Sequence, residues 1–194
     1  MSLELILFIV PILILSIVIH ELAHGYAALL LGDRTAENAG RLTLNPVSHL
    51  DLMGSVILPA VTLSMGFLFG YAKPVPYNPA NLKPGRFSEA IVAAAGPISN
   101  FVLAGVFIIL LNTLGTSIGE HVVQGFGLVI ILYIFLGVFN FIPFAPLDGS
   151  KILFALLPYR ISRQVRYFIE KYWFVFFILL LIIIFQTNLL SNLV

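Results

Sequence analysis

The sequence contains no cysteine among its 194 residues. This absence excludes a disulfide framework, a thiolate metal site and a cysteine nucleophile. Charge is also scarce, because only 10% of the residues are charged and the formal net charge is +1. The sequence has no basic stripe that could follow a phosphate backbone, so we expect no nucleic-acid partner. Any bound metal must therefore be held by histidine and carboxylate side chains.

Hydrophobic residues make up 60% of the chain, which is more than one soluble core of this length normally buries. Crossing about 30 Å of hydrocarbon takes roughly 20 helical residues. Apolar segments of about that length run over 3–31, 52–69, 88–112, 124–144 and 167–184. The sequence thus predicts an all-α integral membrane protein that forms one membrane-embedded domain, 1–194, within the lipid bilayer.

The segment 52–69 is the shortest of these and carries Pro59 near its middle, so it could either span or re-enter. If every segment spans, Arg34 and Arg41 fall on the opposite side from the other eight basic residues. If 52–69 re-enters, all ten lie on one side, as the preference of basic residues for the cytoplasm favours. We therefore expect about four spanning helices, a re-entrant segment, and both termini outside.

Two connections between apolar segments have a recognisable local pattern. Residues 41–44 alternate in polarity and precede Asn45-Pro46, which predicts a short β-strand or hairpin closed by a turn. The connection 71–86 contains four prolines, which cannot donate backbone hydrogen bonds. We expect it to be an ordered, extended loop.

His20, Glu21 and His24 form an HExxH motif within a long apolar segment. Histidines at positions i and i+4 share one face of a helix and can bind one zinc ion. Glu21 follows on the same side, where it can take a proton from the attacking water. Ionisable residues are costly in such a segment and usually functional. The motif predicts a metal site with Glu21 as the catalytic acid/base.

A catalytic zinc site needs a third protein ligand and one open position. Asp148 is the best candidate, because Pro143 and Pro146 break the preceding helix and can turn a carboxylate inward. At 1.5 Å per residue, His20 lies roughly 26 Å along its helix, near the far face of the bilayer. Asp148 reaches the same side only if 52–69 re-enters, so metal binding and the charge count favour the same topology.

Other polar residues in the apolar sequence have weaker interpretations. His49 and Asp51 could support the site or stabilise a turn. Gly96, Pro97 and Asn100 indicate close helix packing with an asparagine that hydrogen-bonds across helices. We rank packing above catalysis for this group.

Several segments together are similar to a known family. They are HELAHG at 20–25, GYAKPVPYNP from 70, AAGPISN from 94 and NFIPFAPLDG at 140–149. The chain resembles the site-2 protease family of intramembrane zinc metalloproteases, in its compact form without PDZ or CBS domains. The resemblance implies one catalytic Zn²⁺ on His20, His24 and Asp148, and Glu21 as the general acid/base. It also implies that Asn140 hydrogen-bonds the substrate near the scissile bond.

The expected reaction is hydrolysis of a peptide bond within or near a transmembrane segment of a membrane-tethered protein, as in regulated intramembrane proteolysis. The predicted strand offers an edge where Leu42, Thr43 and Leu44 could hold an unwound substrate by strand addition. We expect the active site to face the cytoplasmic side. The alternative is an ion-coupled membrane transporter that uses buried His and Asp residues.

Overall fold

The computed structural model describes residues 3–64, 72–115, 118–158, 160–169, 171–172 and 175. Three helices in these parts are long and apolar enough to cross a membrane. They belong to α1 (Leu3–Leu30), α4 (Ser88–Leu114) and α5 (Glu120–Phe141). The protein is therefore a multi-pass membrane protein, as its composition predicts.

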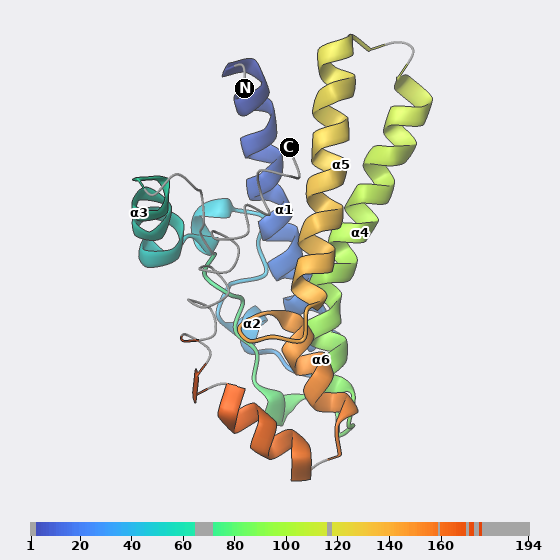
Figure 1. Ribbon diagram of the computed structural model, residues 1–194. Helices are drawn as coiled ribbons and strands as arrows, with labels where there is room; N and C mark the ends of the chain where they lie inside the picture. The colour runs from blue at the N-terminus through green and yellow to red at the C-terminus, as the bar shows by residue number, and fades with distance from the viewer. Residues whose placement is uncertain are drawn as a thin grey trace.

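Helix α4 lies at the centre of the bundle and packs against α1, α5 and the short α6 (Asp148–Leu156). Figure 1 shows α4 and α5 joined at the end of the bundle that lies at the top of the view, which we call the upper end. Helix α1 runs from the upper towards the lower end, and α5 runs the same way. The connections after α1, before α4 and after α5 therefore gather at the lower end, together with α6 (Figure 1).

The segment 52–69 forms no helix long enough to cross a membrane in its described part. It begins as a π-helix over Leu52–Ile57 and continues as α3 (Leu58–Ser64). Its last residues lie outside the described part of the chain. In Figure 1 this pair of short helices lies to one side of the bundle. A re-entrant segment remains compatible with this shape.

The fourth expected span, 167–184, falls mostly outside the described residues. The chain is helical over 160–169, and at 171–172 and 175. This helix lies across the lower end of the bundle in Figure 1, beyond α6. The structure thus accounts for three of the four expected spans and leaves the last as a prediction.

The predicted β-strand at 41–44 is wrong, because the described parts of the chain contain helices, turns and irregular segments but no strand. A strand needs a neighbouring backbone to pair with, and here the backbone groups bond locally instead. The Arg41 N–H donates to the Ala36 carbonyl at 2.9 Å. The Thr43 carbonyl accepts from His49 Nε2 at 2.8 Å. The alternating pattern therefore fits an irregular loop tied down by side chains.

The proline-rich connection is extended from 72 to 78, as expected, and then forms one 3₁₀ turn over Pro79–Asn81. The fully buried Asp33 fastens it to the end of α1. The Asp33 carboxylate accepts from the Asn78 N–H at 2.6 Å and from Asn81 Nδ2 at 3.0 Å. It also accepts from the N–H of Thr35, the first residue of α2 (Thr35–Asn38), at 3.0 Å. One carboxylate thus joins three pieces of chain next to the metal-site helix.

Candidate metal and catalytic site

The HExxH motif lies on α1, about one turn and a half before the end of that helix. His20 and His24 project from the same face, with their Nε2 atoms 3.1 Å apart. Both side chains are nearly buried, at 12% and 11% exposure. The helical spacing therefore brings the two imidazoles together as predicted.

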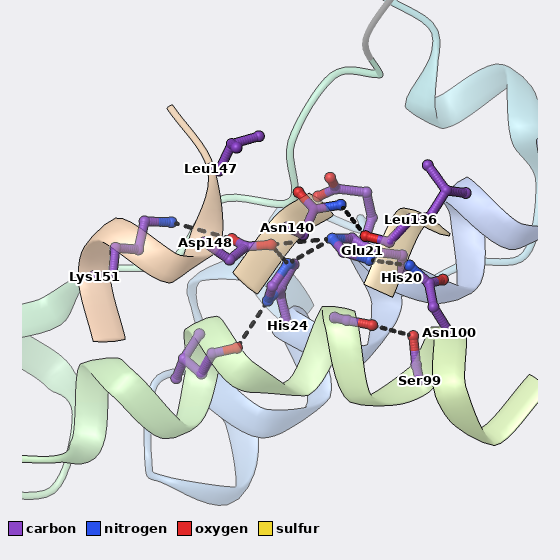
Figure 2. A network of polar contacts seen from close by, with 12 residues as sticks. His20, Glu21, His24, Ser99, Asn100, Leu136, Asn140, Leu147, Asp148 and Lys151 are labelled. Carbon is purple, nitrogen blue, oxygen red and sulfur yellow. Dashed lines mark hydrogen bonds and ion pairs between the residues drawn. The ribbon is translucent and has the colours of Figure 1, made fainter. Parts of the chain in front are cut away.

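The third candidate ligand, Asp148, comes from the start of α6, 124 residues after His24 in the sequence. Helix α5 ends at Phe141, and the segment with Pro143 and Pro146 cannot continue it because proline has no N–H. The chain then turns, and α6 begins at Asp148. Asp148 Oδ2 lies 3.2 Å from His20 Nε2 and 3.2 Å from His24 Nε2. Figure 2 shows these side chains converging on one point.

These three atoms form an almost equilateral triangle with sides of 3.1 to 3.2 Å. Ligand atoms on a tetrahedral zinc ion, at bond lengths of 2.0 to 2.1 Å, are about 3.3 Å apart. The triangle is therefore close to the size that zinc requires. Within the described residues, His20, His24 and Asp148 are the group of His, Asp and Glu side chains close enough together to hold a metal ion.

Contacts around the ligand atoms prepare two of them for metal. His24 Nδ1–H donates to the Val92 carbonyl at 2.7 Å, which leaves Nε2 with its lone pair directed at the triangle. Burial alone would raise the pKa of Asp148, but its contacts with the two imidazoles hold that pKa well below its usual range. Lys151 Nζ lies 3.9 Å from the other oxygen, Oδ1. These contacts favour the charged form of the Asp148 carboxylate.

Two glycines make room for the site. A Cβ atom at Gly96 of α4 would lie 2.5 Å from His24 Cε1 and 2.6 Å from His20 Nε2. A Cβ atom at Gly149, the residue after Asp148, would collide with the carbonyl oxygens of Phe141 and Ile142. Any side chain at Gly96 would therefore displace the imidazoles, and one at Gly149 would displace the turn that carries the carboxylate.

The carboxylate of Glu21 is fixed from outside the helix. Glu21 Oε2 accepts a hydrogen bond from the Val75 N–H at 2.8 Å. Val75 belongs to the extended proline-rich connection, which passes beside α1 at this point. The connection approaches the helix closely: a Cβ atom added at Gly25 would lie only 2.9 Å from Val75 Cγ1. The motif glycine that follows His24 is thus a packing requirement.

Other residues singled out from the sequence have different surroundings. Asn140 lies in the last turn of α5, and its Nδ2 donates to the Leu136 carbonyl at 3.0 Å (Figure 2). Asp51 caps the π-helix by accepting from the Gly54 N–H at 2.8 Å. His49 is buried and bonds to the loop carbonyl of Thr43. These contacts of His49 and Asp51 match the turn-stabilising interpretation.

Gly96 and Asn100 were interpreted from the sequence as packing residues, and the structure brings them to the histidines. Asn100 Nδ2 lies 3.2 Å from His20 Nδ1. The two residues are four positions apart and share one face of α4. The signal available in the sequence was a glycine and an asparagine at helical spacing inside an apolar segment. That signal alone could not say which helix they face.

Comparison with known proteins gives a consistent result. The family model for peptidase family M50 matches residues 8–130 and 115–184. YwhC of Bacillus subtilis strain 168, named as a proposed zinc metalloprotease, is 37% identical over 187 residues, covering 93% of this chain and 82% of the relative. Rip2 of Mycolicibacterium smegmatis, also named as a proposed zinc metalloprotease, is 29% identical over 136 residues, covering 70% of this chain and 52% of the relative. No solved structure shows significant similarity.

Proposed function

The chain belongs to peptidase family M50, the site-2 protease family of zinc metalloproteases, and from this we propose that it cleaves peptide bonds within or near the transmembrane segments of membrane-tethered proteins. The observation that carries the proposal is the triangle of His20, His24 and Asp148, which joins α1 to α6 inside a bundle of candidate membrane spans. A soluble protease would not need to build this site among membrane helices.

We assign one catalytic zinc ion to His20, His24 and Asp148. The fit rests on the two imidazole nitrogens and the carboxylate oxygen, which are spaced as tetrahedral zinc requires. Zinc held there would polarise the substrate carbonyl and lower the pKa of a water molecule towards about 7. The Gly96 position keeps the space over the triangle free of side-chain atoms.

Glu21 acts as the general base and then as the general acid. It takes a proton from the attacking water as the new C–O bond forms, and then passes this proton to the amide nitrogen as the C–N bond breaks and the amine departs. The Val75 N–H holds Oε2, which restricts rotation of the carboxylate and favours one orientation. The second oxygen, Oε1, is then the proton acceptor.

Substrate contacts are assigned to two places. Asn140 lies in the last turn of α5, eight residues before Asp148, where its amide could bond to the substrate backbone near the scissile bond (Figure 2). The loop residues Leu42, Thr43 and Leu44 are the second place. The loop is assigned by its proximity to the site and not by strand pairing. Leu42 packs against Gly25, one turn beyond Glu21, where an added Cβ atom would lie 2.5 Å from Leu42 Cδ2. A transmembrane substrate must unwind before its carbonyl can reach this position.

The proposed orientation places the lower end of the bundle in the cytoplasm and both termini outside. It rests on the ten basic residues, which all fall on one side if 52–69 re-enters. The residues 1–194 then form one membrane-embedded domain, with the active site at its cytoplasmic side and the lipid bilayer around the spans.

The proposal is tested with purified protein reconstituted into vesicles together with a panel of transmembrane peptides. The Glu21→Gln variant should lose at least about 100-fold in cleavage rate while keeping its zinc. Glu37→Gln is the matched control, because Glu37 is an exposed glutamate on α2 that pairs with Arg34. The control should cleave like the wild type. Folded wild-type protein without zinc, or equal cleavage by Glu21→Gln, would contradict the proposal.

A further inference from the structure

A row of buried polar side chains leads from the metal triangle into the apolar core of the bundle. It begins at His20, whose Nδ1 lies 3.2 Å from Asn100 Nδ2. Ser16 Oγ donates to Asn100 Oδ1 at 3.4 Å, and a side-chain hydrogen bond links Ser16 to Tyr133. Ser16, Asn100 and Tyr133 are at most 1% exposed. The row connects α1, α4 and α5 at the level where the site begins.

The two histidines differ in what holds their outer nitrogens. His24 Nδ1 faces a backbone carbonyl, that of Val92, which can only accept a hydrogen bond. His24 is therefore fixed in the tautomer whose Nε2 can bind a metal. His20 Nδ1 faces the side-chain amide of Asn100, which can present either an acceptor oxygen or a donor nitrogen. The tautomer of His20 thus depends on how this amide is turned.

Asn100 Nδ2 faces His20 Nδ1, and donation from this amide would place the proton of His20 on Nε2, which lies 3.2 Å from Asp148 Oδ2. Zinc needs the lone pair of Nε2, so the proton must then sit on Nδ1. A half-turn of the Asn100 amide places Oδ1 against Nδ1–H and Nδ2 against Ser16 Oγ. All partners remain satisfied after this turn, because a hydroxyl can both donate and accept.

We propose that Asn100 is a positioning residue for the zinc ligand His20, and that Ser16 holds its amide for this task. When His20 holds the metal, the Asn100 amide oxygen accepts a hydrogen bond from His20 Nδ1–H. The amide nitrogen then donates a hydrogen bond to Ser16 Oγ. The inference deepens the proposed function, since it assumes that His20 binds zinc. It assigns to α4 a part in metal binding in addition to helix packing.

A purely structural role for Asn100 makes a different prediction. An asparagine that only joins helices should affect folding, and its replacement by aspartate at this buried place should be as harmful as replacement by alanine. A positioning role requires only an acceptor near Nδ1–H, which a carboxylate supplies as it does for many zinc-bound histidines. The comparison of Asp with Ala at position 100 therefore separates the two roles.

The experiment measures zinc retention by the purified full-length protein across a series of chelator concentrations, with thermal unfolding of the same samples. Asn100→Ala should lower zinc affinity by about 10- to 100-fold, the usual loss when a partner of a ligand is removed. Asn100→Asp should stay within about threefold of the wild type, because it restores the acceptor. Ser99→Ala is the matched control: it removes a neighbouring hydroxyl that bonds to the Gly96 carbonyl. It should retain zinc like the wild type.

Equal zinc affinity in wild type and Asn100→Ala would overturn the inference, as would a loss in Asn100→Asp as large as that in Asn100→Ala. If Asn100→Ala does not fold, Asn100→Ser decides, because its hydroxyl is too short to reach His20 and the same loss is expected. His20→Ala is measured beside them. Wild-type protein that binds no zinc through His20 would refute the proposed function itself, whereas a failure confined to the Asn100 variants would refute only this inference.

Discussion

The two ends of the bundle are built from the same three helices and differ in what they bury. At the upper end, α4 and α5 meet through Ala104 and Val129, with Phe107 packed beside them. Their outer faces expose large apolar side chains such as Ile109, at 63%. This surface fits lipid, and its contacts are dispersive and tolerant of small changes.

The lower end buries polar groups instead. His24, Asp33, Asn100 and Asp148 are all at most 9% exposed there. Each needs a directed partner, because a buried polar group without one costs about 1 to 3 kcal/mol. The comparison indicates that residue identity and geometry are tightly constrained only around the site. The rest of the spans need mainly to be apolar and helical.

A pair of glycines on α4 gives the largest contrast between the two ends. Gly96→Ala should place a methyl group against both imidazoles and lower zinc affinity by at least about 100-fold, with loss of cleavage. Gly105→Ala, at the upper end, meets no atom within 4 Å. It should keep zinc and activity, and favour the helix by up to about 1 kcal/mol. Zinc content, cleavage and thermal unfolding are measured for both.

This contrast would break if Gly96→Ala retained zinc, since the helices would then be able to move apart without cost. It would also break if Gly105→Ala impaired zinc binding, because the upper end would then transmit its packing to the site.

A second substitution separates the metal from the base within the lower end. Val75→Pro removes the N–H that donates to Glu21 Oε2 and leaves the three zinc ligands untouched. A hydrogen bond to a charged group is worth about 1.5 to 3 kcal/mol, so kcat should fall by about tenfold or more. Zinc content should not change. Val75→Ala keeps the N–H and should retain the rate; a full rate in Val75→Pro would show that this contact does not orient Glu21.

The sequence predicted the parts of the site that depend on local geometry. The i, i+4 spacing of His20 and His24 needs only a helix, and the apolar run supplies one. Asp148 was identified because two prolines end the preceding helix and because the re-entrant topology returns it to the same side. The three candidate spans in the described residues followed from hydropathy alone.

The missed features depend on contacts between distant segments. The alternation at 41–44 suggested a strand, but no backbone was available to pair with it, and His49 and Arg41 satisfied the loop locally. Likewise, Gly96 and Asn100 lie on the face of α4 that meets α1, which no periodicity in an all-apolar helix can reveal, because every face of such a helix is equally hydrophobic. The partners of this loop and of the buried polar groups therefore had to come from the structure.

The smallest expected effect concerns Asp33, which belongs to the lower end but touches no zinc ligand. Burial alone would raise the pKa of Asp33, yet hydrogen bonds from Thr35, Asn78 and Asn81 lower it below its ordinary value of 3.8. A carboxyl with a lowered pKa stabilises the fold fully above that ordinary value, and the stabilisation is lost as the pH falls through the lowered pKa. The wild type should therefore lose this contribution only below about pH 4.

Asp33→Asn tests this directly. Both carboxylate oxygens of Asp33 accept hydrogen bonds from N–H groups, and in asparagine one of these oxygens is replaced by an NH₂ group, which cannot accept them. It should destabilise the protein by about 1 to 3 kcal/mol at pH 7, and the gap from the wild type should narrow as the pH falls below about 4. Thermal unfolding in detergent at both pH values measures the gap. Asp51→Asn is the control, because asparagine caps a helix as well as aspartate does. A stability difference that stays constant with pH would show that Asp33 acts through its shape and not its charge. Unchanged zinc affinity in both variants would show that metal binding at the lower end depends only on the metal triangle and its direct partners.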